Sequence, residues 1–306
     1  MKKYDVILLT DSRYVNPSEV DWYIQQVLDE DGLVQNALEE LGLKTLRTNW
    51  DNPNIDWRDT KCALFRTTWD YFHRFEEFEE WLNKVNSQTN LFNSKELIYW
   101  NLHKGYLFDL EKKGIRIPPS LLIKKHNNNN LPNNLSSYCN KTNWKEFILK
   151  PAVSGAARHT YRFKRVDLEQ YNDVFNKLIL NEDMILQEFQ NKIISKGEIA
   201  LMFMGGEYTH SVLKKAKSCD FRVQDDFGGS VHHYEASDDE IKFARKIVHA
   251  CSPIPAYARV DLMWDNHNQS CLSELELIEP ELWFRNNPEA AKLLAKAIFN
   301  KLQCLD

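Results

Sequence analysis

Residues 261–264 read Asp-Leu-Met-Trp, and residues 272–281 read Leu-Ser-Glu-Leu-Glu-Leu-Ile-Glu-Pro-Glu. Both segments alternate apolar and polar side chains, and a short polar break separates them, so we expect the two strands of one hairpin. Side chains two apart on a strand share a face, so Glu274 and Glu276 point the same way, and Asp261 lies on the partner strand. The pattern predicts three carboxylates on one face of a sheet.

Such a face has two interpretations. Carboxylates this close raise one another's pKa and destabilise the fold unless cations neutralise them. Hard oxygen ligands of this kind suit Mg²⁺ that nucleotide phosphates also hold. A solvated acidic face is the alternative, and these residues alone do not separate the two interpretations.

The sequence around this hairpin mixes further hairpins with helices, which is α+β in character. Gly205-Gly206 is a turn of the type that closes a two-residue hairpin. The predicted strands end at Lys150-Pro151 or span 184–189, 199–203, 208–213, 257–264 and 271–278, and the predicted helices span 167–180, 238–250 and 288–303.

The first hundred residues alternate strand-like and helix-like pieces, which predicts a Rossmann-like α/β lobe with a parallel sheet. The strands are expected at 4–9, 43–48 and 62–65, and the helices at 31–41, with Val34, Leu38 and Leu41 on one face and Gly42 as its stop, and at 75–85. Arg66 ends the third strand, where ligands of open α/β sheets usually bind. With Asp70 it would form a charged pair suited to a zwitterionic amino acid.

The pattern changes near residue 100. A helix over 102–113, carrying Lys104 and closed by Gly114, leads to an extended segment that starts at Pro118-Pro119. Residues 126–143 begin as an Asn-rich stretch and are expected to form a surface loop. We therefore predict three units: residues 1–100 as a substrate lobe, 101–190 as a central subdomain with a phosphate flap, and 191–306 as a C-terminal subdomain with the metal site.

Lys104 and Lys150 are candidates for binding phosphate. Lys150 precedes a loop of small residues, Ser154 to Ala157, whose backbone N–H groups can approach an anion closely. The loop is not the Gly-rich P-loop of nucleoside triphosphatases. A lysine before a loop of small residues is common, so taken alone an ordinary strand-to-loop turn explains it better.

Composition excludes several classes of protein. The chain has 306 residues and a formal net charge of −5, which provides no positive field for nucleic acid or an anionic membrane. No apolar run approaches the length of a membrane span, and the N-terminal run is too short for a signal peptide, so a cytoplasmic location is expected. The apolar C-terminal helix could cover the core of its own chain or pack against a second copy, so a homodimer is one possible state.

The order of the candidate residues resembles the ATP-grasp superfamily of carboxylate–amine ligases, in its glutathione-synthetase and ribosomal-protein-modifying branch. The matching pieces, in sequence, are Lys104, Lys150 with its loop, Gln187-Glu188-Phe189, Gly197-Glu198, Asp220-Phe221-Arg222, Gly228-Gly229, Asp261 and Glu274-Leu275-Glu276. Within that branch, residues 66–71, 100–107 and 150–154 are similar to the O-ureido-serine cyclo-ligase group of cycloserine biosynthesis.

The resemblance implies a role for each position. ATP phosphates would be held by Lys104 and Lys150, under a flap that includes Ser154 and Gly155. Adenine would be bound by Gln187, Glu188 and Phe189, the ribose by Glu198, and the transferring phosphoryl group would be stabilised by Arg222 with Lys150. The substrate would face Arg66, Asp70, Arg222, Gly228 and Gly229, and Mg²⁺, with Mn²⁺ as the alternative, would be bound by Asp261, Glu274 and Glu276. Relatives commonly have Asn where this chain has Glu276, so the number of metal ions is left open.

The function implied is ATP- and Mg²⁺-dependent formation of a C–N bond on a small amino-acid-like carboxylate, through an acyl phosphate, with release of ADP and phosphate. Intramolecular amide closure and ligation to a second small molecule both fit. A protein-modifying ligase and a non-catalytic ATP sensor are the alternatives.

Overall fold

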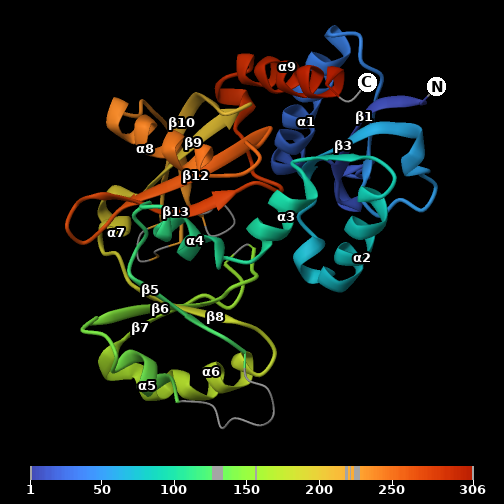
Figure 1. Cartoon of the computed structure of the whole chain (residues 1–306). Helices are drawn as coiled ribbons and strands as arrows, with labels where there is room; N and C mark the ends of the chain where they lie inside the picture. Colours follow the sequence, from blue (N-terminus) through green and yellow to red (C-terminus); the bar gives the residue numbers. More distant parts are fainter. Residues whose placement is uncertain are drawn as a thin grey trace.

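In the part of the chain that the structure describes, three β-sheets are packed with helices (Figure 1). The computed structural model describes residues 2–125, 134–155, 157–217, 220, 222–223 and 228–304. One sheet is parallel and belongs to the N-terminal lobe, and the other two are antiparallel. This division confirms the expected combination of an α/β lobe with an α+β remainder.

The N-terminal lobe holds four parallel strands in the order β2-β1-β3-β4. The strands are β1 (Tyr4–Thr10), β2 (Thr45–Asn49), β3 (Thr60–Thr67) and β4 (Asn90–Phe92), and the helices are α1 (Trp22–Glu40) and α2 (Phe75–Asn86), with 3₁₀ turns at Ser12–Tyr14, Trp57–Asp59 and Tyr71–His73. The switch in strand order lies between β1 and β3, so their carboxyl ends form the edge where a ligand would bind.

Helix α1 begins earlier than the sequence predicted. The carboxylate of Asp21 accepts a hydrogen bond from the backbone N–H of Ile24, and this cap starts the helix well before residue 31. The predicted apolar face is confirmed at Val34 and Leu38, whose side chains are fully buried. It was wrong at Leu41, which is 41% exposed because the helix ends at Glu40.

The central sheet has the order β5-β8-β6-β7, and all neighbouring strands in it are antiparallel. Its strands are β5 (Ser120–Ile123), β6 (Glu146–Pro151), β7 (Tyr161–Lys164) and β8 (Met184–Glu188), and its helices are α5 (Leu135–Cys139) and α6 (Asn172–Ile179), with a 3₁₀ turn at Arg165–Tyr171. The helices cover one face of this sheet, at the bottom of Figure 1. Strand β7, which the sequence analysis missed, pairs with β6 and places the phosphate loop between them.

The third sheet has the order β11-β10-β9-β12-β13 and is also antiparallel. Its strands are β9 (Glu198–Met204), β10 (Glu207–Lys215), β11 (Ser230–Tyr234), β12 (Tyr257–Trp264) and β13 (Ser270–Glu276), and the helices around it are α4 (Tyr106–Lys112), α7 (Lys192–Lys196), α8 (Asp238–His249) and α9 (Glu289–Gln303), with a 3₁₀ turn at Phe284–Asn286. Both predicted hairpins are confirmed. Gly205 and Gly206 have φ values of 60° and 91°, as the first hairpin turn requires.

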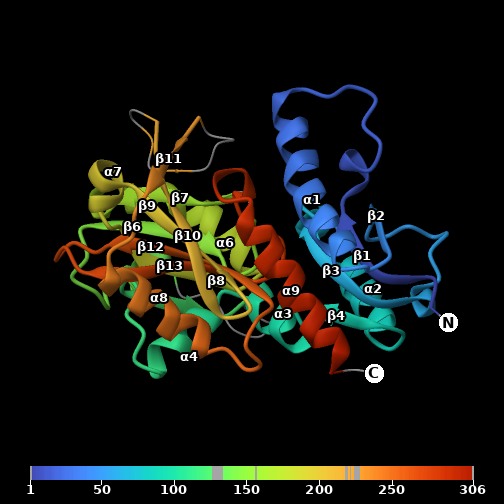
Figure 2. The ribbon, with the colours of Figure 1, turned by 90° about the horizontal axis from the view of Figure 1, so that it is seen from above.

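The two faces of β9 enter different cores. Ile199, Leu201 and Phe203 pack with α4 and α8, whereas Ala200 and Met202 share a core with the N-terminal lobe and α9. Seen from above, α9 runs between the third sheet and α1 (Figure 2). The C-terminal helix therefore joins the two parts of the chain.

The segment between the two parts differs from its prediction. The helix expected over 102–113 begins only at Tyr106, as α4, and the sequence analysis did not predict α3 (Lys95–Leu102). Lys104 lies in the turn between these two helices. The ring of His103 accepts a hydrogen bond from the N–H of Gly105, which closes this turn. Of the loop expected at 126–143, residues 126–133 lie outside the described residues, and the remainder contains α5.

Two buried asparagines hold this region against the third sheet. Asn93 donates to the carbonyls of Tyr257 and Leu277 and accepts from the N–H of Ala256. Asn101 likewise donates to the carbonyl of Leu275 on β13 and accepts from the N–H of Leu277, the residue after that strand. These bonds satisfy backbone groups that would otherwise be buried without partners. Within the described ranges, no helix is long and apolar enough to cross a bilayer.

Candidate active site

A cavity of about 620 Å³ opens where the three sheets meet. Its wall includes the turn after β1, the turn after β3, the β6–β7 loop, the end of β8 and the β12–β13 hairpin. The predicted residues that line it are Asp70, Lys104, Lys150, Ser154, Gly155, Gln187, Glu188, Phe189, Glu198, Arg222, Asp261, Glu274 and Glu276. The sequence analysis therefore named most of the charged side chains that the fold brings together here.

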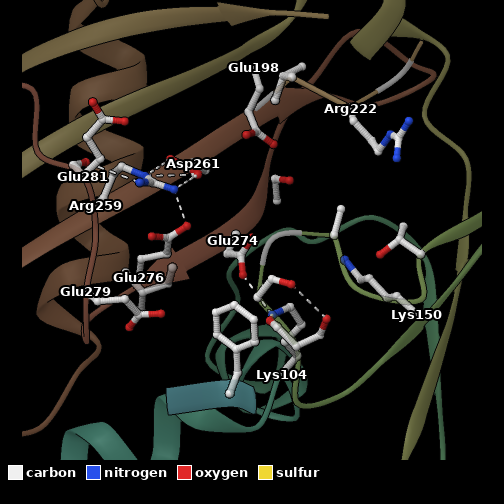
Figure 3. Close-up of a pocket in the computed structure, with 18 of the residues that line it drawn as sticks. Lys104, Lys150, Glu198, Arg222, Arg259, Asp261, Glu274, Glu276, Glu279 and Glu281 are labelled. Atoms are coloured by element: carbon white, nitrogen blue, oxygen red, sulfur yellow. Dashed lines mark hydrogen bonds and ion pairs between the residues drawn. The ribbon is translucent and has the colours of Figure 1, made fainter. Parts of the chain in front are cut away.

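The carboxylate of Asp261 is buried beside the guanidinium of Arg259, as Figure 3 shows, and it also contacts the ammonium group of Lys214. Its Oδ2 lies 2.7 Å from Nζ of Lys214 on β10, and its Oδ1 lies 2.9 Å from Nε of Arg259 on its own strand. Burial opposes ionisation of Asp261, but the two cations outweigh it and lower the pKa. Lys214 also binds Glu198 at 2.6 Å, so one ammonium group joins the two acids.

Glu274 and Glu276 face the same cavity but have different partners. Glu274 lies 2.9 Å from Nζ of Lys104, and Glu276 contacts the guanidinium of Arg259. Burial would raise the pKa of Glu274, but Lys104 and Lys150 lower it overall. Burial and the neighbouring carboxylates raise the pKa of Glu276 to about 7, because Arg259 compensates only in part.

A fourth carboxylate, Glu279, follows β13. Burial, with Glu276 as the next contribution, raises the pKa of Glu279 to about 8, although a hydrogen bond with Tyr71 opposes the shift. Figure 3 shows Glu276, Glu279 and Glu281 along one side of the cavity, opposite Lys150 and Arg222. The lining as a whole carries more carboxylates than lysine and arginine side chains.

This acidic set fits a divalent cation by its donor chemistry. All three predicted ligands offer carboxylate oxygens from one hairpin, and the raised pKa of Glu276 reflects negative charge that the basic side chains leave uncompensated. In the conformation described, the oxygens are held by Lys104, Lys214 and Arg259. Among the described residues, no three potential ligand side chains are grouped closely enough to hold a metal ion by themselves.

The side of the cavity formed by the central sheet suits a nucleotide. Burial lowers the pKa of Lys150, so this cation lacks full compensation. Phe189 is buried at the end of β8, and the guanidinium of Arg162 stacks 3.8 Å from its ring centre. Gln187 donates to the hydroxyl of Ser120, and Glu188 follows it in the cavity wall.

Arg222 reaches the cavity, whereas Gly228 and Gly229 are absent from its described lining. The guanidinium of Arg222 donates to both carboxylate oxygens of Asp220, at 3.1 and 3.2 Å from Nε and 2.8 Å from a terminal nitrogen. Phe221 and residues 224–227, which belong to the predicted motif, lie outside the described residues.

The expected pair of Arg66 with Asp70 does not form. Arg66 is 1% exposed, donates to Asp31 at 3.2 Å, and is absent from the described cavity lining. It belongs to the last part of β3, and its side chain enters the lobe's interior. Asp70 does line the cavity, and its two oxygens accept hydrogen bonds from Trp50 and Arg74.

Arg13 is the arginine that the N-terminal lobe presents to the cavity. Its guanidinium binds the fully buried carboxylate of Asp11 at 2.6 Å, yet 60% of the Arg13 side chain is exposed. Tyr14, Tyr23 and Trp69 form an aromatic wall beside it, with Trp69 edge-on to Tyr14 at 5.8 Å. The turn of residues 11–14 follows β1, so it lies at the same sheet edge as Asp70.

Comparisons with known proteins agree with this architecture. Residues 6–93 match the family model described as the N-terminal domain of D-cycloserine synthetase DcsG. The cycloserine biosynthesis protein DcsG of Streptomyces lavendulae is 24% identical over 279 residues, which cover 87% of this chain and 92% of that protein. The crystal structure of D-cycloserine synthetase DcsG has a TM-score of 0.81 at 22% identity and covers 97% of this chain and 99% of its own.

Two further structures extend the comparison. D-alanine–D-alanine ligase from Bacillus anthracis has a TM-score of 0.65 at 14% identity, over 99% of this chain and 98% of its own. The ATP-grasp ligase PsnB, complexed with a phosphomimetic variant of its minimal precursor, Mg and ADP, has a TM-score of 0.63 at 12% identity, over 99% of this chain and 100% of its own. The chain has the ATP-grasp fold. Its fold agrees with the resemblance in sequence, and its sequence is similar to that of DcsG over most of its length.

Within this ATP-grasp chain, sequence reasoning missed Lys214, Arg259 and Arg13. Arg259 had a signal, because it lies two residues before Asp261 on β12 and so shares its face. Arg13 also had one, since it follows the first strand of a parallel sheet. For Lys214 the predicted hairpin at Gly205-Gly206 indicated a place near Glu198, but no signal indicated Asp261, because that contact depends on β9 pairing with β12 as well.

The pKa of Glu279 makes stability depend on pH. An unfolded glutamate has its ordinary pKa, so between about pH 4.5 and pH 8 the folded chain binds more protons and loses stability as the pH rises. Glu279→Gln removes this loss. In the ligand-free protein we expect the free energy of unfolding of the variant to exceed that of wild type by on the order of 1 kcal/mol near pH 8.5, and by little near pH 5. The difference is this small because solvent screens a half-buried group.

Melting temperatures of both proteins at the two pH values measure this effect. Glu39→Gln is the control, because hydrogen bonds from Thr45 and Gln35 lower the pKa of Glu39 and give no gain at high pH. An equal difference between Glu279→Gln and wild type at both pH values would contradict the prediction.

Proposed function

We propose that this chain is an ATP-dependent ligase that joins a carboxylate to an amine in a small amino-acid-like substrate and releases ADP and phosphate. One observation carries the proposal: the two candidate phosphate-binding lysines, the acidic hairpin and the ligand-binding edge of the N-terminal sheet open into one cavity. A substrate carboxylate on that edge would lie beside the phosphates of a nucleotide on the central sheet.

The chemistry needs two steps. A carboxylate oxygen attacks the γ-phosphorus of ATP, and the bond from this phosphorus to the β–γ bridging oxygen breaks. The products of this step are ADP and an acyl phosphate. An amine nitrogen then attacks the carbonyl carbon, phosphate departs with the C–O bond electrons, and the nitrogen loses a proton. Catalysis consists mainly of holding the reactants in line and stabilising charge on the transferring group.

The residues of the cavity suit these tasks. Lys104 and Lys150 would hold phosphates, and Arg222 and Arg259 would stabilise charge on the transferring group. Asp261, Glu274 and Glu276 would hold Mg²⁺, which supplies neutralisation of phosphate charge when it is bound. A phosphate at Lys104 would compete with Glu274 for the ammonium group, and so release a carboxylate to the metal.

The N-terminal edge supports the substrate class. Arg13 and Asp70 give the cavity one group of each sign, and the aromatic wall bounds a small space between them. The relative DcsG is named for cycloserine biosynthesis, which makes cyclisation of a single small molecule the first form of ligation to test.

A ligase for peptides is the second candidate. PsnB and the macrocyclase MdnC of Microcystis aeruginosa share the fold and are complexed with precursor peptides. In this chain Trp22 is 67% exposed, and its ring lies 5.7 Å from that of Tyr23, which lines the cavity. This apolar surface beside the cavity would suit part of a longer substrate.

Release of ADP tests the proposed function. The purified protein with ATP and Mg²⁺ is screened against amino acids, O-substituted serines, dipeptides and glutathione precursors. We expect one carboxylate to stimulate turnover strongly. We expect Glu274→Ala to reduce that turnover by about 100-fold or more, because a ligand of the Mg²⁺ that would neutralise the transferring phosphates is lost. Glu207→Ala, an exposed glutamate at the start of β10, should retain wild-type turnover.

Two results would contradict the ligase. Full activity in Glu274→Ala would remove the acidic hairpin from the mechanism. Tight binding of ATP with no stimulation by the carboxylates and peptides of the panel would favour the non-catalytic sensor.

Arg13 tests the substrate end of the cavity. We expect Arg13→Ala to raise KM for the carboxylate substrate by about tenfold or more and to leave KM for ATP within about twofold, since a charged hydrogen bond contributes roughly 1.5–3 kcal/mol. Arg58→Ala is a matched control, because Arg58 binds Asp56 in the same Asp-x-Arg arrangement but lies outside the described cavity lining. Equal changes of both KM values in Arg13→Ala would place Arg13 in the nucleotide site.

A further inference from the structure

Residues 69–73, here called the bridging segment, follow β3 and contact both other parts of the molecule. The indole N–H of Trp69 donates to the backbone carbonyl of Glu279 at 2.9 Å. The hydroxyl of Tyr71 forms a hydrogen bond with the carboxylate of the same residue. The segment is thus tied to the chain that follows β13.

Phe72 carries the contact with the central subdomain. A Cβ atom placed on Gly155 would lie 2.8 Å from Cε1 and 2.9 Å from Cδ1 of the Phe72 ring. Such distances are below van der Waals contact, so the ring lies directly against the backbone of Gly155. A side chain at residue 155 would have to displace this ring.

The same loop is fixed from the turn that carries Lys104. Nζ of Lys104 donates to the carbonyl of Ser154 at 2.7 Å, and its backbone N–H donates to the carbonyl of Ala152 at 2.7 Å. Residues 152–155 of the phosphate loop therefore lie between the Lys104 turn and the Phe72 ring. Both side chains line the cavity.

We infer that Phe72 is a positioning residue that seals the junction between the N-terminal lobe and the phosphate loop, and so keeps water from the transferring phosphoryl group. This inference rests on the proposed ligase function. The ring touches loop backbone rather than a reacting atom, so it acts through Gly155. Its neighbour Asp70 lines the cavity, and a substrate bound there would fix the ring and the loop together.

The seal matters because water competes with the carboxylate. A water oxygen that reaches the γ-phosphorus breaks the same bond to the bridging oxygen, and ATP is converted to ADP, phosphate and a proton without forming an amide. A water that attacks the acyl phosphate regenerates the carboxylate and also consumes one ATP. An intact seal therefore keeps ADP release equal to product formation.

Hydrogen exchange of the ligand-free chain tests the contact itself. We expect Phe72→Ala to increase exchange by about tenfold in peptides covering residues 152–160, because a loop held by fewer contacts opens more often. Phe75→Ala is the matched control: Phe75 packs on the same N-terminal core but lies outside the described cavity lining. Wild-type exchange in Phe72→Ala, or the same increase in Phe75→Ala, would overturn the inference.

A double-mutant cycle excludes a general loss of folding. Gly155→Ala pushes the ring away and should also increase exchange of the loop, but it should add little in the Phe72→Ala background, where the space is free. Additive effects of the two substitutions would contradict a direct contact. Melting temperatures of the four proteins accompany the cycle.

Turnover tests the consequence. With ATP, Mg²⁺ and the stimulating carboxylate, we expect wild type to release one ADP for each amide formed, and Phe72→Ala to release at least about twice as much ADP as amide, because water gains access. Phe72→Leu, which keeps apolar bulk, should restore most of the coupling. A ratio of one in Phe72→Ala would overturn the sealing role. If wild type shows no turnover, the proposed function fails, whereas the exchange results still decide the contact.

Discussion

The architecture of the cavity depends on neutralising the carboxylates of the β12–β13 hairpin. Taking an ionised carboxylate out of water costs several kcal/mol unless cations and hydrogen bonds compensate it. Here Lys214 comes from β10, Arg259 from β12 and Lys104 from the turn between α3 and α4. The requirement for charge balance therefore constrains how three separate segments pack around the hairpin.

The charges in the cavity are compensated only in part. The groups whose charges are not compensated are those that suit the site to a nucleotide and its metal ion. Glu276 and Glu279 keep raised pKa values, while burial lowers the pKa of Lys150 on the opposite wall. A divalent cation at the acidic side and a phosphate chain at the lysines would relieve both at once. In the ligand-free protein these groups are thus shifted toward their neutral forms, and ligands of the opposite sign would restore their charges.

The sequence carried the local part of this arrangement. A period of two over residues 272–276 placed Glu274 and Glu276 on one face, and the hairpin brought Asp261 to them, as the structure confirms. Gly205-Gly206 marked the other hairpin for a physical reason, since both residues need a positive φ. The order of motifs then indicated the ATP-grasp fold, which the comparisons show.

Contacts between side chains on distant segments could not be predicted from the sequence. Lys214 meets Asp261 only through the order of the third sheet, and Arg66 turned inward to Asp31 on α1, so Arg13 presents the N-terminal cation instead. The helix pattern around Lys104 concealed a turn that a histidine ring closes. The contact of Phe72 with Gly155 joins two lobes, and neither residue signals it in the chain.

Titration of the wild-type protein with AMPPNP, a non-hydrolysable ATP analogue, tests the central claim most directly. Isothermal calorimetry with Mg²⁺ and with EDTA separates the contribution of the lysines from that of the acidic hairpin. The account predicts a single nucleotide site per chain and a Kd at least about tenfold higher in EDTA, a difference of about 1.4 kcal/mol. No binding, or equal Kd values in Mg²⁺ and EDTA, would contradict a nucleotide and metal site built on the β12–β13 hairpin.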